Sequence, residues 1–170
     1  MNRTVSETRR EFLKKASAAA IGAVGLPLFV PSTVLGRSGA VPPSDRINIG
    51  CIGVGGMGIS NMESFLVKPE AQIVAVCDVD ARHRAMAREI VEKKTGKKGC
   101  SEYNDFLELL GRDDLDAISL ATPDHWHALI AVAAAKKRLD IYGEKPLGYS
   151  IQEGRAIVDA VERYGVIWQT

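Results

Sequence analysis

The sequence predicts an α/β fold, a doubly wound parallel sheet of about six strands with helices on both faces. The first observation is that short apolar runs alternate with helix-like patterns from residue 47 onward, an order that places helices over a parallel sheet. The second is a glycine-rich turn after the first apolar run, and the third is an acidic residue at the end of the second run. A length of 170 residues, with 46% hydrophobic and 25% charged side chains, suits one globular domain of this kind.

The glycine-rich turn lies in residues 47–58, which read I-N-I-G-C-I-G-V-G-G-M-G. An apolar strand passes into three glycines with G-x-G-x-x-G spacing and a helix-like pattern follows, which is the Rossmann arrangement for binding a dinucleotide. Gly53 permits the turn, Gly55 lets the backbone approach the phosphates, and Gly58 lets the helix pack close to the strand. The start of the helix then offers N–H groups and a partial positive charge to a pyrophosphate.

The second apolar run, residues 73–77, ends in Asp78, which lies 20 residues after Gly58. An acid at this position can accept hydrogen bonds from the hydroxyl groups of an adenosine ribose. Glycine-rich turns also occur in α/β domains that bind no nucleotide, so the turn by itself is weak evidence. The acid at the expected distance favours a Rossmann nucleotide site.

The later elements follow from apolar periodicity and from turn and capping residues. In chain order we expect a helix after the glycine turn, a helix over 81–95 that stops at Gly96, a short strand at Tyr103, a brief helix over 106–110 capped by Asn104 or Asp105, a strand over 116–121, a helix from 125 to 133, a strand over 139–142, and a sixth strand from 166. Before that last strand, Ser150 and Glu153 form the capping-box pattern of a helix that ends at Gly165.

Charge and cysteine content exclude some classes of function. The first 36 residues hold five of the 22 Lys and Arg residues and two of the 21 Asp and Glu residues, so the remainder has 17 basic and 19 acidic side chains, a net charge of −2. No basic stripe remains for binding nucleic acid. Cys51, Cys77 and Cys100 are odd in number and lack metal-ligand spacing. Small core side chains are the favoured interpretation, and no metal site is expected.

Residues 1–40 are predicted to be an export signal and linker rather than part of the fold. Residues 8–14 read T-R-R-E-F-L-K, which resembles the twin-arginine motif, and an apolar stretch of 15 residues follows over 16–30. That stretch is too short for a membrane span and suits the core of a signal peptide. An amphipathic helix with a chance arginine pair is the alternative. We therefore expect the twin-arginine export machinery as a partner, no stable membrane anchor, and a periplasmic or secreted protein whose dinucleotide-binding domain occupies residues 45–170.

Four features together resemble the glucose–fructose oxidoreductase / inositol dehydrogenase (Gfo/Idh/MocA) family: the glycine turn, Asp78, the segment over 122–127, and Glu-Lys-Pro at 144–146. The resemblance covers residues 45–170, and the Glu-Lys-Pro tripeptide is its most specific part. It implies a nicotinamide-dependent oxidoreductase for sugars, polyols or related small molecules. In that family a C-terminal α/β domain follows the Rossmann domain and carries an Asp and His acid/base pair. No Asp-x-x-x-His occurs after Lys145, so we expect the N-terminal part of a longer enzyme, inactive by itself.

The resemblance also implies which residues hold the cofactor. The pyrophosphate would lie on Gly53, Gly55, Met57 and Gly58. Asp78 would bind the adenosine ribose, and its negative charge would favour NAD over NADP, a preference that Arg82 could soften.

The nicotinamide side of the crevice would be formed by residues that follow the fourth and fifth strands: Thr122, Pro123, His127, Glu144, Lys145 and Pro146. Lys145 would contact the cofactor and the substrate hydroxyl and stabilise charge that develops on oxygen. The family also implies a cis Lys145–Pro146 bond. His127 could equally cap its helix. His125 and Trp126 suit a structural role or a contact at the substrate's edge.

Three functions are compatible with these residues. The leading hypothesis is an NAD(P)-dependent oxidoreductase that removes hydride from a carbinol carbon of a sugar or polyol while a base takes the hydroxyl proton. The alternative is a closed cycle with retained NAD, either between two sugars or as a lyase or glycosidase through a transient keto-sugar, which would suit a compartment poor in free NAD. The third is a nucleotide-binding module without catalysis. A homo-oligomer is compatible with each.

Overall fold

Six parallel strands form a single sheet in the computed structural model, which describes residues 41–170. The strands are β1 (Ile47–Ile52), β2 (Ala71–Cys77), β3 (Ser101–Tyr103), β4 (Ala117–Leu120), β5 (Asp140–Gly143) and β6 (Trp168–Gln169). They lie in the order β3-β2-β1-β4-β5-β6, and every neighbouring pair is parallel. The order reverses between β1 and β4, so the sheet is doubly wound as predicted. The signal and linker predicted for residues 1–40 lie outside the described residues.

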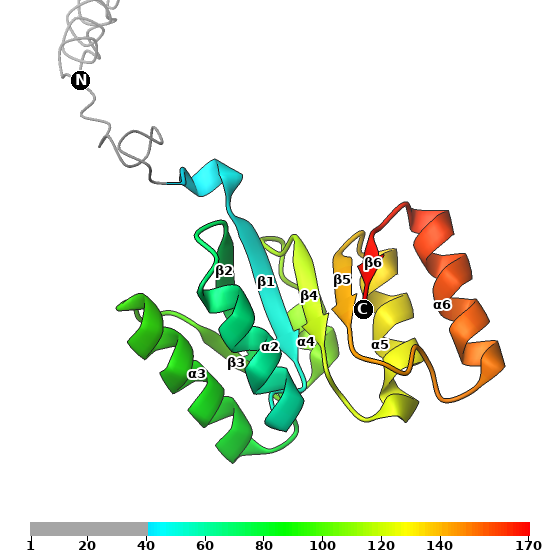
Figure 1. The fold of residues 1–170 in the computed structure, drawn as a ribbon, viewed down its shortest axis with the longest axis horizontal. Coiled ribbons are helices and arrows are strands. Elements are labelled where there is room, and N and C mark those ends of the chain that lie inside the picture. Colours follow the sequence, from blue (N-terminus) through cyan, green and yellow to red (C-terminus); the bar gives the residue numbers. More distant parts are fainter. Residues whose placement is uncertain (1–40) are drawn as a thin grey trace, which may run out of the picture.

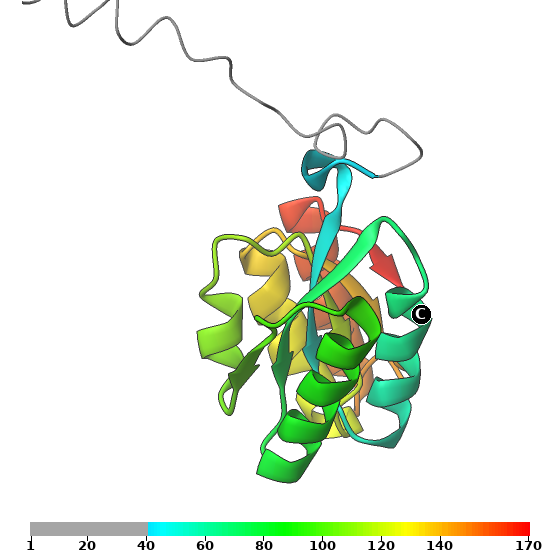
Figure 2. The same ribbon diagram turned by 90° about the vertical axis from the view of Figure 1, so that its left-hand side faces the viewer.

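Helices cover both faces of this sheet. A short 3-10 helix, η2 (Pro43–Asp45), precedes β1, and the α-helices are α2 (Gly56–Leu66), α3 (Ala81–Thr95), α4 (Phe106–Leu110), α5 (Asp124–Lys136) and α6 (Ile151–Tyr164). Figures 1 and 2 show α2 and α3 on one face and α4, α5 and α6 on the other. Right-handed crossovers cause this division, because the chain moves one way along the sheet from β1 to β3 and the opposite way from β4 to β6. Within residues 41–170, no helix combines the length and hydropathy needed to cross a bilayer.

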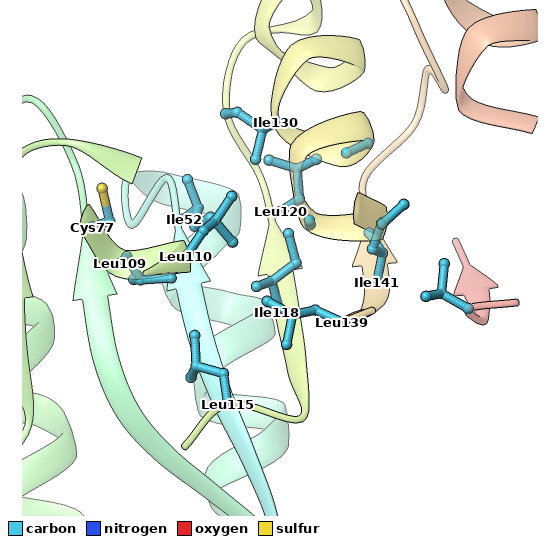
Figure 3. Close-up of a cluster of buried hydrophobic side chains, with 14 of the residues drawn as sticks. Ile52, Cys77, Leu109, Leu110, Leu115, Ile118, Leu120, Ile130, Leu139 and Ile141 are labelled. Carbon is cyan, nitrogen blue, oxygen red and sulfur yellow. The ribbon is translucent and has the colours of Figure 1, made fainter. Parts of the chain in front are cut away.

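The two faces of the sheet bury separate hydrophobic clusters. Alternate residues of a strand point to opposite faces, so Ile52 joins the cluster under α4, α5 and α6, whereas Ile49 and Cys51 join the cluster under α2 and α3. Figure 3 shows the larger cluster, in which strand residues such as Ile118 and Leu120 of β4 pack between the sheet and the helices. Cys51, Cys77 and Cys100 are all free and buried, which confirms the prediction that they are small core residues.

The ends of the helices agree with the capping residues of the sequence. Asp105, not Asn104, caps α4, because its side chain accepts a hydrogen bond from the N–H of Leu107 at 2.8 Å. The capping box of α6 is present, with Ser150 accepting from the Glu153 N–H at 3.2 Å. Asn104 instead accepts a hydrogen bond from Arg84 at 3.1 Å. The predicted elements are thus confirmed, with shifts of a few residues at their ends.

Candidate cofactor-binding site

The glycine turn brings the ends of three elements into close contact. Gly53 has a φ of 80°, a conformation that favours glycine, and a side chain there would lie 2.6 Å from the Ala121 carbonyl oxygen at the end of β4. A side chain at Gly58 would overlap the Gly53 carbonyl oxygen. These two glycines therefore let β1, α2 and β4 meet, as the fingerprint requires.

Gly55 and Met57 lie where a ligand would meet the start of α2. Gly55 is the N-cap of α2 and makes no side-chain capping bond, so the first N–H groups of the helix face outward without a capping side chain. The nearest atoms to a side chain built at Gly55 belong to the His83 ring, at 3.7 Å. Met57 is 58% exposed in the first turn. An anion at this position would meet backbone N–H groups and the positive end of the helix dipole.

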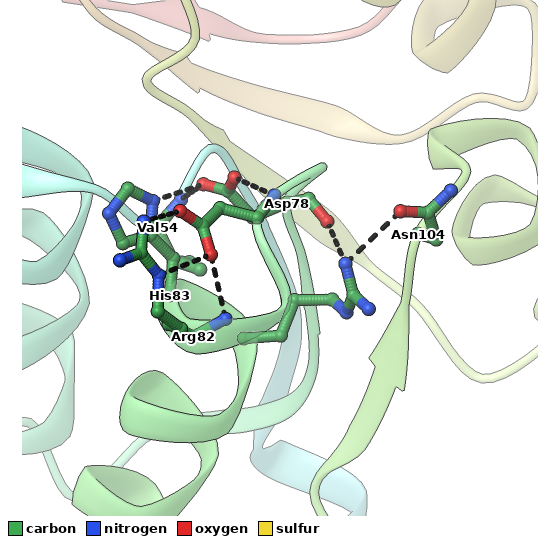
Figure 4. Close-up of polar contacts among 7 residues, drawn as sticks. Val54, Asp78, Arg82, His83 and Asn104 are labelled. Carbon is green, nitrogen blue, oxygen red and sulfur yellow. Dashed lines mark hydrogen bonds and ion pairs between the residues drawn. The ribbon is translucent and has the colours of Figure 1, made fainter.

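Asp78 is held at the end of β2 by the glycine turn itself. One carboxylate oxygen accepts a hydrogen bond from the Val54 N–H at 2.9 Å, and the other accepts from the Asp80 N–H, also at 2.9 Å. Figure 4 shows these contacts converging on the carboxylate. Each oxygen keeps a further lone pair, so the oriented carboxylate can still accept hydrogen bonds from a diol such as a ribose.

Arg82 does not approach Asp78. Its guanidinium lies 2.7 Å from an Asp80 carboxylate oxygen, and its side chain is 90% exposed. Hydrogen bonds from the side chain and the backbone N–H of Arg82 hold the pKa of the Asp80 carboxyl group below its ordinary value. The fold therefore gives no support to the expectation that Arg82 could soften the preference for NAD over NADP, because Asp80 engages its guanidinium.

His83 is the neighbour of Asp78 that sequence reasoning missed. Its Nδ1 lies 3.5 Å from an Asp78 carboxylate oxygen, and its ring faces Gly55. The position in the first turn of α3 was the available signal, since side chains there point back toward the helix N-terminus. Figure 4 shows His83 on the glycine-turn side of the carboxylate.

A cleft of about 350 Å³ opens along the carboxyl ends of β1, β2 and β4. It lies at the point where the strand order reverses, which is the ligand position of doubly wound sheets. Its walls are formed by Ile52, Gly53, Gly55, Cys77, Asp78, Val79, His83, Asn104, Phe106, Ala121, Thr122, Pro123, Trp126 and Ile130. The Phe106 and Trp126 rings meet edge-on there at 6.3 Å.

Thr122 and Pro123 both line this cleft, as expected. The Thr122 Oγ1 is buried and has no hydrogen-bond partner within residues 41–170. A buried hydroxyl without a partner is costly, and a polar group of a bound molecule would relieve that cost. Together with the oriented Asp78 and the uncapped start of α2, this orphaned hydroxyl fits a bound dinucleotide.

His127 lies beneath the cleft rather than along it. Its side chain is 1% exposed, its Nδ1 is 2.7 Å from the Pro146 carbonyl oxygen, and its Nε2 is 2.8 Å from the Thr122 carbonyl oxygen. The expectation that it lines the nicotinamide side is therefore not met by the side chain, because both ring nitrogens are used by neighbouring loops. It is not a helix cap either, since α5 has no side-chain cap.

Glu144, Lys145 and Pro146 follow β5, next to β4 in the sheet. The Lys145–Pro146 bond is cis, as the family resemblance implies. Glu144 accepts a hydrogen bond from the Asn61 side chain on α2 at 2.9 Å. Lys145 is exposed, and no hydrogen bond or ion pair within residues 41–170 involves its ammonium group. The ammonium group of Lys145 is therefore available to a ligand.

Known proteins resemble this chain in sequence and in fold. It is 32% identical to the alpha-N-acetylgalactosaminidase of Shewanella oneidensis over 91% of this chain and 37% of the relative. It is 34% identical to a glycosyl hydrolase family 109 protein of Solibacter usitatus over 91% of this chain and 36% of that protein. The chain thus spans somewhat more than a third of the length of these relatives.

Solved structures share the fold at lower identity. The myo-inositol 2-dehydrogenase of Lactobacillus plantarum superposes with a TM-score of 0.66 at 21% identity, over 73% of this chain and 35% of that chain. An NAD-binding oxidoreductase of Klebsiella pneumoniae gives a TM-score of 0.60 at 28% identity, over 73% and 34%. The family model described as "Oxidoreductase family, NAD-binding Rossmann fold" (GFO_IDH_MocA) matches residues 47–170. The chain therefore belongs to the Gfo/Idh/MocA family of NAD-binding oxidoreductases.

Proposed function

We propose that this chain provides the NAD-binding part of an enzyme that oxidises a hydroxyl-bearing carbon of a sugar or polyol. The observation that carries the proposal is a pair of groups at one edge of the sheet. Asp78 is oriented by two backbone N–H groups at the glycine turn, and Lys145 follows β5 with its ammonium group free of partners in residues 41–170. The first suits the ribose of a dinucleotide, and the second suits an oxygen that gains negative charge.

Some residues of the chain would bind the cofactor, and Lys145 would act on the substrate. The start of α2 would hold the pyrophosphate through its N–H groups, and Asp78 would orient the adenosine ribose. Lys145 would donate a hydrogen bond to the substrate oxygen as its proton leaves to a general base, which lowers the energy of the developing alkoxide. When bound, NAD supplies the acceptor for the hydrogen and the two electrons that leave the carbinol carbon.

A second candidate is a glycosidase with retained NAD. The names of two relatives, an alpha-N-acetylgalactosaminidase and a glycosyl hydrolase family 109 protein, favour it. In such a cycle the sugar would be oxidised to a keto-sugar, which makes a hydrogen beside the carbonyl acidic. Loss of that proton would expel the aglycone, which takes up a proton, and water would add to the resulting double bond. The same two electrons would then return to the carbonyl carbon of the sugar. No net NADH forms, so the cofactor need not exchange.

Export by the twin-arginine route is also a proposal, which rests on residues 8–14. That route carries folded proteins, so the Rossmann domain could leave the cytoplasm with NAD already bound. Replacing Arg9 and Arg10 together by lysine should keep the protein in the cytoplasm, as measured by cell fractionation. Unchanged export of that variant would contradict the assignment.

The test of function uses the full-length protein. Absorbance and mass spectrometry first show whether NAD remains bound after purification. The protein is then supplied with free sugars and with an aryl α-N-acetylgalactosaminide. NADH that accumulates in proportion to oxidised sugar supports the dehydrogenase, whereas aglycone release that requires bound NAD without net NADH supports the retained-cofactor cycle.

The role of Lys145 has a matched control in Lys137, an exposed lysine at the C-cap of α5. We expect Lys145→Ala to lower kcat by about 100-fold or more, the usual effect of losing a donor to a developing oxyanion, and Lys137→Ala to leave it unchanged. Equal turnover in the two variants would contradict the catalytic role. Failure of the wild-type protein to bind NAD at all would overturn the proposed function.

A further inference from the structure

Two buried polar side chains contact the loop that carries Lys145. His127, in the first turn of α5, contacts the carbonyl oxygen of Pro146 at 2.7 Å. Asn61, 7% exposed on α2, donates a hydrogen bond to the side chain of Glu144 at 2.9 Å. Lys145 is therefore flanked in sequence by one residue bound to α5 and one bound to α2.

These two contacts reach the loop from opposite sides of the sheet. Helix α2 covers one face and α5 covers the other (Figures 1 and 2). The Glu144 N–H also donates to the Leu120 carbonyl oxygen at 2.9 Å, which ties the loop to the end of β4. The backbone that carries Lys145 is thus held from both faces and from the neighbouring strand.

His127 also joins this loop to the wall of the cleft, since its Nε2 lies 2.8 Å from the Thr122 carbonyl oxygen. A carbonyl oxygen can only accept, so each contact is a hydrogen bond only where the facing ring nitrogen carries a proton. At 1% exposure, no water replaces either partner without opening the site. A nonpolar residue at this position would leave at least one carbonyl oxygen without the donor that His127 supplies, which is costly in a buried site.

We propose that His127 and Asn61 are positioning residues, which fix the backbone of Lys145 so that its ammonium group reaches the substrate oxygen. The inference rests on the function proposed above. A lysine side chain has a long flexible stem, so the placement of its ammonium group depends on where its backbone is held. A displacement of about 1 Å in a reacting group can cost on the order of 100-fold in rate.

The orientation of the His127 ring predicts different effects for two isosteric substitutions. The amide nitrogen of an asparagine can lie near the position of Nδ1, which faces Pro146, whereas that of a glutamine can lie near Nε2, which faces Thr122. His127→Asn should therefore keep the Lys145 loop in place, and His127→Gln should release it. His127→Leu and Asn61→Leu should release it as well.

The experiment compares these variants in the full-length protein loaded with NAD. Hydrogen exchange of residues 143–150, followed by mass spectrometry, reports the loop without requiring activity; kcat, KM and the NAD dissociation constant are measured alongside. The destabilising control is Val91→Ala, a buried truncation in α3 within the opposite cluster. Asn61→Ala, which removes the donor to Glu144 without placing a larger nonpolar side chain there, provides a second test of that contact should Asn61→Leu not fold.

We expect faster hydrogen exchange of residues 143–150 in His127→Leu, His127→Gln and Asn61→Leu. In these variants kcat should fall by about 10- to 100-fold. The NAD dissociation constant should change by less than about threefold, which is too little to account for the fall in kcat. His127→Asn should stay near wild type, and Asn61→Ala should show the same faster exchange and lower kcat as Asn61→Leu. Val91→Ala should change neither exchange in this segment nor kcat. Unchanged exchange in both His127→Leu and Asn61→Leu would overturn the inference. Faster exchange with full kcat would support the anchoring of the loop but overturn the inference that this anchoring positions Lys145 for catalysis. The catalytic role of Lys145 itself is tested separately by Lys145→Ala.

Discussion

The closest backbone approach in the glycine turn provides a sharp test of the fold. A side chain at Gly58 would overlap the Gly53 carbonyl oxygen and lie 2.8 Å from its carbonyl carbon. Both are backbone atoms, so relief requires α2 to move away from β1. Gly56, two residues earlier in the same helix, has no atom within 4 Å of the space that its side chain would fill. Gly58→Ala and Gly56→Ala are therefore a matched pair.

The difference between the two variants isolates the overlap. Replacing glycine by alanine in a helix favours the folded state by up to about 1 kcal/mol, and this gain is common to both positions. Overpacking of a close contact costs about 1–3 kcal/mol. We therefore expect Gly56→Ala to be as stable as the wild type or slightly more stable, and Gly58→Ala to be less stable than Gly56→Ala by about 1–3 kcal/mol.

Urea denaturation followed by circular dichroism measures this difference. The m-values of both variants should match the wild type, because the surface exposed on unfolding is nearly unchanged. Equal free energies of unfolding for Gly58→Ala and Gly56→Ala would refute the reasoning. That result would mean that α2 does not depend on the close approach that the turn imposes.

Three further outcomes follow from the contacts described above. Asp78→Ala leaves the Val54 and Asp80 N–H groups without their acceptor and should raise the NAD dissociation constant by about tenfold or more, the equivalent of one charge-assisted hydrogen bond. Arg82→Ala should change neither the affinity for NAD nor the preference for NAD over NADP. Calorimetry that shows unchanged NAD binding in Asp78→Ala and weaker NAD binding in Arg82→Ala would contradict the geometry. Ser150→Ala removes the capping side chain of α6 and should lower the free energy of unfolding by about 1 kcal/mol, with exposed Ser60→Ala as the control that stays at the wild-type value. Burial raises the pKa of Cys77 to about 12 and that of Cys100 to about 11, so these thiols should stay unlabelled by a disulfide reagent at pH 8 until urea unfolds the chain. Unfolded thiols ionise first, with a pKa of about 8.5, so the free energy of unfolding should fall as pH rises from about 9 toward 11, by up to about 1.4 kcal/mol per pH unit for each thiol. Cys77→Ala should make this slope shallower. A free energy of unfolding that does not change over this range would contradict the burial of the thiols.

Local signals in the chain determined most of the fold. Strand and helix patterns depend on spacings of two to four residues, and helix ends depend on capping residues such as Ser150 and Gly165, so both can be predicted without tertiary contacts. The glycine spacing and Asp78 likewise predicted where the cleft lies, because the carboxyl ends of parallel strands meet at one edge of a doubly wound sheet. The sequence leaves the choice between Asn104 and Asp105 as a cap open, since it depends on which side chain a distant arginine engages.

Only the tertiary structure decided how the site's side chains are used. His83 approaches Asp78 because of how the first turn of α3 lies beside the glycine turn, whereas Arg82 pairs with the nearby Asp80 instead. His127 contacts Pro146, 19 residues away, and Asn61 contacts Glu144, 83 residues away. Such pairings are set by the crossover of strands in the sheet, and no local spacing encodes them. The sequence by itself thus determined the scaffold and the place of the cleft, whereas the packing of helices on opposite faces decided which residues hold Lys145.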